Sequence, residues 1–281
     1  MGPARAAIDR AGRELADAVF PRRCFLCGRH AEDGLACRDH VLPAAPPGPR
    51  CGTCAGPLPP AVPDGARCAD CRTRSPGFRS LVALCDYRAQ PVGRAWLLAL
   101  KYGGRREVAL PLGLALGTAW LRRAPARWRG DAVLVPVPLH WSRRLERGFD
   151  QARALAVHAA RTAGLPWAAA LRRRVATAVQ GAPGSASRSA NVRDAFRARR
   201  RARGDGRVVR LEGRCVWLVD DVVTSGATVT ECARELRRAG AAAVCVLAVA
   251  RAGPGAPGDS GESGPAGPAR TAAGGWGTLA G

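Results

Sequence analysis

The feature that most constrains the fold is an apolar run near the C-terminal end that leads directly into two adjacent carboxylates. Residues 215–219 (CVWLV) are short and uncharged, which is typical of a buried strand in a parallel sheet. Asp220 and Asp221 follow, and then come a loop of small and hydroxyl residues and a helical pattern that stops at Gly240. Residues 243–250 predict the next strand. This order of elements predicts an α/β domain with a parallel sheet.

The loop after the acid pair has the composition of a phosphate site. Small residues let backbone N–H groups approach a phosphate, and hydroxyls and a helix N-terminus add further donors. Two carboxylates do not favour phosphate, but they suit the hydroxyls of a sugar. The pattern therefore predicts a ligand with a 5-phosphate and free ribose hydroxyls. The candidate binding residues are Asp220, Asp221, Thr224, Ser225, Gly226, Ala227 and Thr228. We call residues 224–228 the hydroxyl loop.

The start of the following helix is open at this stage. Thr228 and Glu231 fit a capping box, although the helix could begin up to three residues earlier. The alternative to a ligand site is an ordinary strand-to-helix turn with an aspartate as N-cap, which needs one aspartate and no run of hydroxyls.

Four pairs of potential metal ligands near the N-terminus, which we call knuckles, predict metal binding. Each pair has the x-x spacing that lets two side chains reach one ion from a tight turn. The residues are Cys24, Cys27, Cys37, His40, Cys51, Cys54, Cys68 and Cys71. Eight ligands suffice for two closed tetrahedral Zn²⁺ sites, and a closed site is structural. The segment has almost no apolar core of its own, so metal must supply most of its folding energy.

Several alternatives remain for this segment. A disulfide framework is disfavoured in a cytoplasmic protein, and a redox pair would explain one knuckle out of four. His40 is either a fourth ligand or a bystander. Sequential and crossed pairings of the knuckles are both open. The four single cysteines, Cys85, Cys215, Cys232 and Cys245, lie in apolar patterns typical of a core.

Charge and hydropathy limit the class of protein. The longest uncharged apolar run, residues 108–121, is shorter than the roughly 20 residues of a membrane span, and no signal peptide is visible. We therefore expect a cytoplasmic protein with no membrane span. The net charge of +22 favours polyanions such as nucleic acid or phosphorylated metabolites, although a solvated basic surface would also explain it.

Arginines are concentrated in two places. Arg143, Arg144 and Arg147 follow the predicted strand 133–137, at the strand end where open α/β sheets bind ligands. Residues 172–214 contain 13 arginines and three acids. Thirteen arginines exceed the number that binding of a single pyrophosphate group needs. Single-stranded DNA is a candidate partner of this segment, and a solvated face is the alternative.

Lys101 is the only lysine in the chain and precedes a Tyr-Gly-Gly turn. A compact ammonium suits a place where a guanidinium is too large. We expect a ligand contact here, with chance retention as the alternative.

The ordered set of motifs, from about Pro21 to Arg251, resembles the ComF family of amidophosphoribosyltransferase-like proteins linked to competence and DNA uptake. The motifs are the cysteine knuckles, Leu100-Lys101-Tyr102, Pro136-Val137-Pro138-Leu139, residues 147–151 (RGFDQ), the segment 180–196 and the Asp-Asp loop. His40 and Asp150 stand where the family usually has cysteine and asparagine.

The resemblance implies a type I phosphoribosyltransferase domain that binds phosphoribosyl pyrophosphate (PRPP) with Mg²⁺, in DNA uptake or nucleotide metabolism. It implies pyrophosphate binding near Arg143, Arg144 and Arg147, and a mobile loop that contains Arg188. Lys101 is a further candidate contact. A DNA-uptake or helicase-like protein is a candidate partner.

Two functional classes follow from this resemblance. One is a pentosyl transferase with an unknown acceptor, for which no catalytic residue can be named. The other is a non-catalytic module that binds PRPP or a nucleotide together with single-stranded DNA. A plain zinc-dependent DNA-binding protein is a third reading, but it gives the acid pair no role.

Composition breaks divide the chain into four parts. We expect an N-terminal helix over 1–22, a zinc-finger module over 23–75, the phosphoribosyltransferase-like domain over 76–251 and a disordered tail over 252–281.

Overall fold

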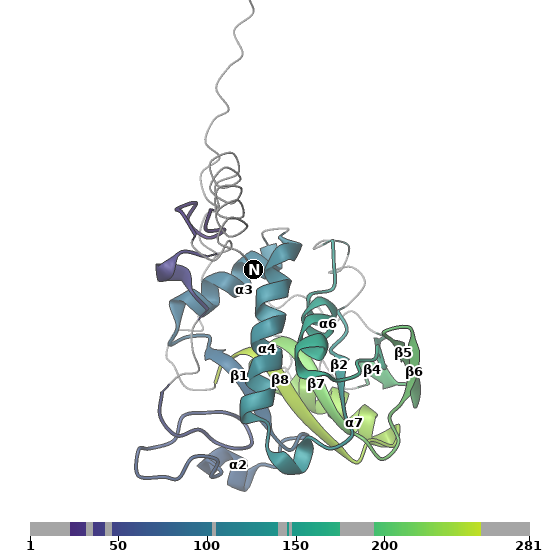
Figure 1. Ribbon diagram of the computed structural model, residues 1–281. Coiled ribbons are helices and arrows are strands. Elements are labelled where there is room, and N and C mark those ends of the chain that lie inside the picture. Colours follow the sequence, from purple (N-terminus) through teal and green to yellow (C-terminus); the bar gives the residue numbers. More distant parts are fainter. Residues whose placement is uncertain are drawn as a thin grey trace, which may run out of the picture.

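Figure 1 shows a computed structural model of the chain. The structure describes residues 23–31, 36–42, 47–102, 105–139, 145, 148–174 and 194–253. The predicted N-terminal helix and nearly all of the predicted disordered tail lie outside these residues.

A four-stranded parallel sheet forms the centre of the molecule. Its strands are β1 (Leu81–Asp86), β8 (Ala243–Arg251), β7 (Cys215–Val223) and β2 (Ala132–Pro136), in that order across the sheet. The strands are short apolar runs because both of their faces are covered. Their carboxyl ends share one edge, where Arg251 pairs in register with Asp86 on one side and with Val223 on the other.

Helices cover both faces of the sheet (Figure 1). One face packs against α3 (Pro91–Tyr102), α4 (Ala109–Arg123) and α6 (Gln151–Ala163), and the other packs against α7 (Ala227–Arg238). The short 3₁₀ helix η2 (Arg106–Val108) precedes α4, and η3 (Ala126–Trp128) follows it. On the first face, Trp217 of β7 meets Trp120 of α4 edge to face, with ring centroids 6.1 Å apart.

Helices α4 and α6 approach each other closely because glycines lie at their contact. A Cβ atom added at Gly117 would lie 2.5 Å from the Thr162 Cβ and 2.7 Å from the Ala159 carbonyl oxygen. Gly113 is equally tight against His158. Small residues are therefore required along this side of α4.

Two antiparallel hairpins flank the sheet on the α7 side. Strand β3 (Leu171–Arg173) pairs with β4 (Phe196–Ala198), and β5 (Arg201–Gly204) pairs with β6 (Arg207–Arg210). Their buried residues, such as Phe196 and Val209, join the core on this face.

In the described residues of the cysteine-rich segments, regular structure is limited to the 3₁₀ helix η1 (Arg38–His40) and the short α2 (Ala69–Thr73). The first segment docks on α3, where Trp96 Nε1 donates a hydrogen bond of 2.8 Å to the His40 carbonyl oxygen. Phe25 also packs edge to face on Trp96, with ring centroids 4.3 Å apart. One tryptophan thus anchors this segment to the α/β domain.

The predicted fold class, an α/β parallel sheet with a small N-terminal cysteine module, is confirmed. The single cysteines Cys85, Cys215, Cys232 and Cys245 are all buried, as expected. The strand predicted over 215–219 is longer than expected, because it continues through the acid pair to Val223. None of the helices in the part of the chain that the structure describes has the length and hydrophobicity of a bilayer span.

Candidate functional site at the carboxyl edge of the sheet

The acid pair lies in β7 near its carboxyl end and is joined there by the only lysine of the chain. The Lys101 Nζ lies 3.2 Å from the Asp221 Oδ2, with side-chain exposures of 21% and 16%. Lys101 comes from the last turn of α3, the helix that follows β1, and β8 lies between β1 and β7 in the sheet. Two signals that the sequence offered separately therefore form one cluster of charges.

Asp220 has an unusual protonation equilibrium. Removal from water, and then the negative charge of Asp221, raise its pKa from 3.8 to about 8, against the opposing charge of Lys101. The Asp220 Oδ1 accepts a hydrogen bond of 2.8 Å from the Asp221 backbone N–H. Near neutral pH the pair can therefore hold a proton and offer a sugar both a donor and an acceptor.

The hydroxyl loop follows the strand and opens helix α7. Thr224 and Ser225 are exposed, and Gly226 adopts a φ of 78° as the N-cap residue. A left-handed conformation is available to glycine without strain. The helix begins at Ala227, so its first backbone N–H groups face the loop end, as a phosphate site requires.

The capping box predicted from Thr228 and Glu231 is wrong. The Glu231 Oε1 instead accepts a hydrogen bond of 2.9 Å from the Asp194 backbone N–H and pairs with Arg234. Gly226 provides no side chain to cap α7, and only a long 3.4 Å contact joins the Ala227 N–H to the Ser225 Oγ.

A cavity of about 250 Å³ adjoins the hydroxyl loop. Its walls include Thr224, Ser225 and Gly226 from the loop, and Cys54 and Cys71 from the cysteine module. The cysteine-rich segment and the candidate phosphate site are therefore direct neighbours.

Arg251 at the end of β8 also lines this cavity, and it was absent from the sequence-based candidates. Its position pairs in register with Val223, directly before the loop. The signal that could have identified it is the alignment of neighbouring parallel strands, which brings the last residues of both to one edge.

The knuckles pair sequentially into two clusters. The first cysteine cluster contains Cys24, Cys27, Cys37 and His40, and the second contains Cys51, Cys54, Cys68 and Cys71. Within each cluster all ligand atoms lie within 4.8 Å of one another. His40 thus lies inside the first cluster: its Nδ1 is 3.3 Å from the Cys37 Sγ and 3.5 Å from the Cys24 Sγ.

These distances fit a tetrahedral metal ion. The Cys27 and Cys37 Sγ atoms are 3.7 Å apart, and so are those of Cys54 and Cys68. Zinc–ligand bonds near 2.3 Å to sulfur and 2.0 Å to nitrogen separate two sulfurs by about 3.8 Å, and sulfur from nitrogen by about 3.5 Å. In addition, hydrogen bonds from Arg29 lower the pKa of Cys27 to about 6, which favours the thiolate. Both clusters could therefore hold a structural metal ion.

Other sequence candidates divide into two groups. Arg143, Arg144, Arg147 and Arg188 lie outside the described residues. Asp150 is described, and its carboxylate caps α6 by accepting a hydrogen bond of 3.0 Å from the Arg153 N–H. Asparagine caps helices equally well, so the departure from the family pattern leaves this local structure intact.

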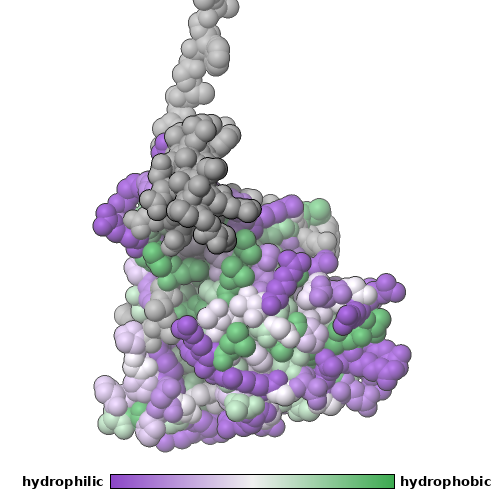
Figure 2. All heavy atoms as spheres, in the orientation of Figure 1, coloured by the Kyte–Doolittle hydropathy of each residue, from purple (hydrophilic) through white to green (hydrophobic). Residues whose placement is uncertain are grey.

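The β5–β6 hairpin presents four exposed arginines of the basic segment. Arg201 and Arg210 are directly opposite each other in the hairpin. Both side chains are exposed, and those of Arg203 and Arg207 are exposed too. Like charges directly opposite each other destabilise a hairpin. On the right of Figure 2 the surface over this hairpin is mostly hydrophilic.

Several known proteins named DNA utilization protein YhgH match the chain in sequence. The chain is 34% identical over 232 residues to the DNA utilization protein YhgH of Escherichia coli (strain K12), covering 81% of this chain and 89% of that protein. It is 35% identical, with the same coverage, to the protein of that name from Salmonella typhi. No family model matches the chain.

Solved structures also match part of the chain, and two examples show the extent of the likeness. The allosteric regulatory enzyme of purine biosynthesis matches with a TM-score of 0.36 and 22% identity, over 54% of this chain and 30% of that one. The glutamine PRPP amidotransferase from B. subtilis, complexed with ADP and GMP, matches with a TM-score of 0.35 and 23% identity, over 53% and 30%.

Proposed function

Because this chain belongs to the ComF family, whose members include the DNA utilization proteins just described, we propose that it binds PRPP with Mg²⁺ at the carboxyl edge of its sheet. The observation that carries the proposal is the contact of Lys101 with Asp221 one short loop before the N-terminus of α7. This arrangement places sugar-binding carboxylates, a cation and phosphate donors next to one another.

Each group has a distinct role in this proposal. Asp220 and Asp221 hydrogen-bond the ribose hydroxyls, and residues 224–228 surround the 5-phosphate. The Lys101 ammonium stands beside the acid pair, where it balances the second carboxylate and attracts the pyrophosphate. Mg²⁺ enters on the pyrophosphate oxygens and neutralises part of their charge. Arg143, Arg144, Arg147 and Arg188 remain predictions as pyrophosphate contacts.

We further propose that both cysteine clusters hold Zn²⁺ and that residues 23–75 form a zinc-binding module. The sulfur–sulfur spacing of 3.7 Å in each cluster supports this assignment. Because each set of four ligands closes a tetrahedron, the zinc is structural. The shared wall between Cys54, Cys71 and the hydroxyl loop suggests that the second ion also supports the ligand site.

Calorimetry with PRPP and Mg²⁺ tests the proposed site. In the variant Asp220→Ala/Asp221→Ala, two or more hydrogen bonds to charged groups are lost, at roughly 1.5–3 kcal/mol each, so affinity should fall at least about 100-fold. Arg199→Ala/Arg200→Ala, in the exposed basic segment, is the control and should keep the wild-type affinity. Unchanged binding in the aspartate variant would show that the loop is only structural.

A measurement of pyrophosphate release distinguishes a transferase from a binding module. The transferase class requires release when PRPP is offered with a suitable acceptor base. Binding without release, for each base tested, would favour the non-catalytic class.

Single-stranded DNA binding is a second candidate function, which the Arg201–Arg210 pair of the hairpin favours. An exposed pair of like charges is stabilised when a polyanion lies across it. Fluorescence anisotropy with oligo(dT) should show affinity that falls by powers of ten as salt rises several-fold. Arg201→Gln/Arg210→Gln should reduce both the affinity and the salt slope. Binding that is insensitive to salt would contradict this function.

A further inference from the structure

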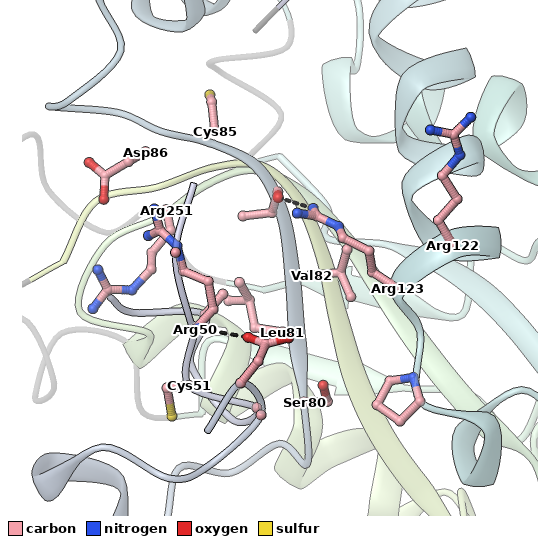
Figure 3. A pocket seen from close by; sticks show the side chains of 17 residues that line it. Arg50, Cys51, Ser80, Leu81, Val82, Cys85, Asp86, Arg122, Arg123 and Arg251 are labelled. Atoms are coloured by element: carbon pink, nitrogen blue, oxygen red, sulfur yellow. Dashed lines mark hydrogen bonds between the residues drawn. The ribbon is translucent and has the colours of Figure 1, made fainter. Parts of the chain in front are cut away.

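A larger cavity, of about 460 Å³, lies between the second cysteine-rich segment and the edge strand β1 (Figure 3). Four arginines line it and come from three separate parts of the chain: Arg50, Arg122, Arg123 and Arg251. We call this cavity the arginine pocket. In Figure 3, Arg123 reaches β1 from the end of α4, while Arg50 and Arg251 approach from the other side of the strand.

The two acids of the arginine pocket, Asp64 and Asp86, balance only part of the charge of its four arginines. The Asp64 Oδ1 accepts a hydrogen bond of 2.7 Å from the Arg50 backbone N–H. The Asp86 Oδ1 accepts from the backbone N–H groups of Arg88 and Ala89, at 3.0 and 3.2 Å. One oxygen of each carboxylate is thus bound to the backbone, and within the described ranges none of the four guanidinium groups forms an ion pair.

Two of the guanidinium groups, those of Arg50 and Arg123, lie in surroundings that disfavour a charged hydrogen-bond donor. The Arg50 Nε is buried and has no hydrogen-bond partner among the described residues. Arg123 donates to the Ala83 carbonyl oxygen of β1. Burial, and then the positive charge of Arg50, lower the pKa of Arg123, against the opposing negative charge of Asp64. Buried donors and neighbouring like charges cost stability, and a bound anion would relieve both.

We propose that the arginine pocket binds a small ligand with a phosphate chain, of the size of a free nucleotide. Its volume lies within the range of roughly 300–1,000 Å³ found for small-molecule sites. Guanidinium groups match phosphate oxygens with paired, charge-assisted hydrogen bonds. A cavity of this volume, lined by arginines from three parts of the chain, favours a free small molecule over the backbone of a nucleic acid.

This site is separate from the proposed PRPP site. The acid pair, Lys101 and the hydroxyl loop do not line the arginine pocket. Arg251 and the apolar Leu81 are shared, because both also line the smaller cavity beside the loop. The two sites can therefore be tested with different variants.

Calorimetry with tripolyphosphate, on the zinc-loaded full chain without Mg²⁺, tests the proposal. We expect Arg50→Gln/Arg123→Gln to weaken tripolyphosphate binding at least tenfold. Arg201→Gln/Arg203→Gln removes the same charge from the exposed hairpin and should change it less than twofold. The pocket variant should keep its affinity for PRPP with Mg²⁺, and Asp220→Ala/Asp221→Ala should keep its affinity for tripolyphosphate. Failure of the proposed function would therefore leave this result intact.

Three outcomes would overturn the proposal: no tripolyphosphate binding to the wild type, equal losses in the pocket and hairpin variants, or a loss confined to oligo(dT) binding. If the pocket variant does not fold, crystals of the wild type soaked in tungstate provide a second measurement. We expect a tungstate ion among Arg50, Arg123 and Arg251. Tungstate found only elsewhere on the protein would refute the site.

Discussion

Replacing Asp220 by asparagine should stabilise the protein at alkaline pH while it damages the proposed ligand site. The raised pKa of about 8 means that folding favours the protonated carboxyl. Asparagine has the same shape and carries no charge, so it keeps the neutral form at every pH. Asp220→Asn therefore removes the cost of a carboxylate held beside Asp221.

The magnitude follows from proton linkage. The folded state holds the proton up to about pH 8, whereas the unfolded chain releases it near 3.8, so between these values unfolding releases a proton. Stability must then fall as the pH rises through this window. For one group with these two pKa values, the loss between pH 6 and pH 8 is about 2.3 kcal/mol. Lys101 and partial solvation reduce it, so about 1–2 kcal/mol is expected.

Urea unfolding of the zinc-loaded protein at pH 6, 7 and 8 measures this effect. The wild type should lose stability relative to Asp220→Asn as the pH rises, because all other titrating groups are common to both proteins. His158, for example, has a pKa lowered by burial and by Arg161, which makes stability rise with pH near 6.5 in both.

The control for this experiment is Asp205→Asn, an aspartate in the exposed turn of the β5–β6 hairpin, which should keep the wild-type pH slope. Equal slopes for the wild type and Asp220→Asn would refute the reasoning, since they would show that Asp220 is ionised in the folded protein throughout this range.

Three further predictions concern the supporting structure. Metal analysis after gel filtration should find two zinc ions per chain. Cys71→Ser should retain one ion and lose PRPP affinity, because the second cluster adjoins the hydroxyl loop. Less than half an equivalent of zinc in the wild type would contradict the assignment of both clusters as zinc sites. Gly117→Ala should lower the free energy of unfolding, measured by urea titration, by about 1–2 kcal/mol, since overpacking against α6 exceeds the gain in helix propensity. Gly130→Ala is the control: no atom lies near the added carbon, so the free energy of unfolding should change by less than about 0.5 kcal/mol. Trp96→Phe should cost about 1 kcal/mol through the lost bond to the His40 carbonyl and should speed release of one zinc ion to a colorimetric chelator; an unchanged release rate would show that Trp96 does not hold the first cluster.

The sheet was predictable because its strands are buried on both faces. Runs such as residues 215–219 and 243–250 have no polar positions, so the sequence alone indicates their environment. The hydroxyl loop was predictable because its chemistry is local. The capping of α7 was not, because Glu231 finds partners at Asp194 and Arg234 that only tertiary packing brings near.

Contacts between distant segments account for the rest. Lys101 was identified by its rarity, but its partner could not be, since Asp221 lies 120 positions away in the chain. The sequential pairing of the knuckles was equally open, because both pairings satisfy the same spacing. The arginine pocket was invisible in the sequence, where its arginines stand among forty other basic residues.

The strand order of the sheet has a consequence for how the chain is made. Strands β1 and β2 are synthesised early, but they occupy the two edges of the sheet and do not touch each other. Among the described residues, their partner strands come from the last part of the domain, β8 for β1 and β7 for β2, and β2 adds one bridge between Leu134 and Trp167. While the ribosome is still translating residues 87–242, β1 has no partner in the nascent chain. The cysteine module can close early around its metal, but the sheet must assemble after translation reaches Arg251. A chain that stops before residue 243 therefore lacks a central strand and leaves β1 unpaired, a substrate for chaperones and proteases.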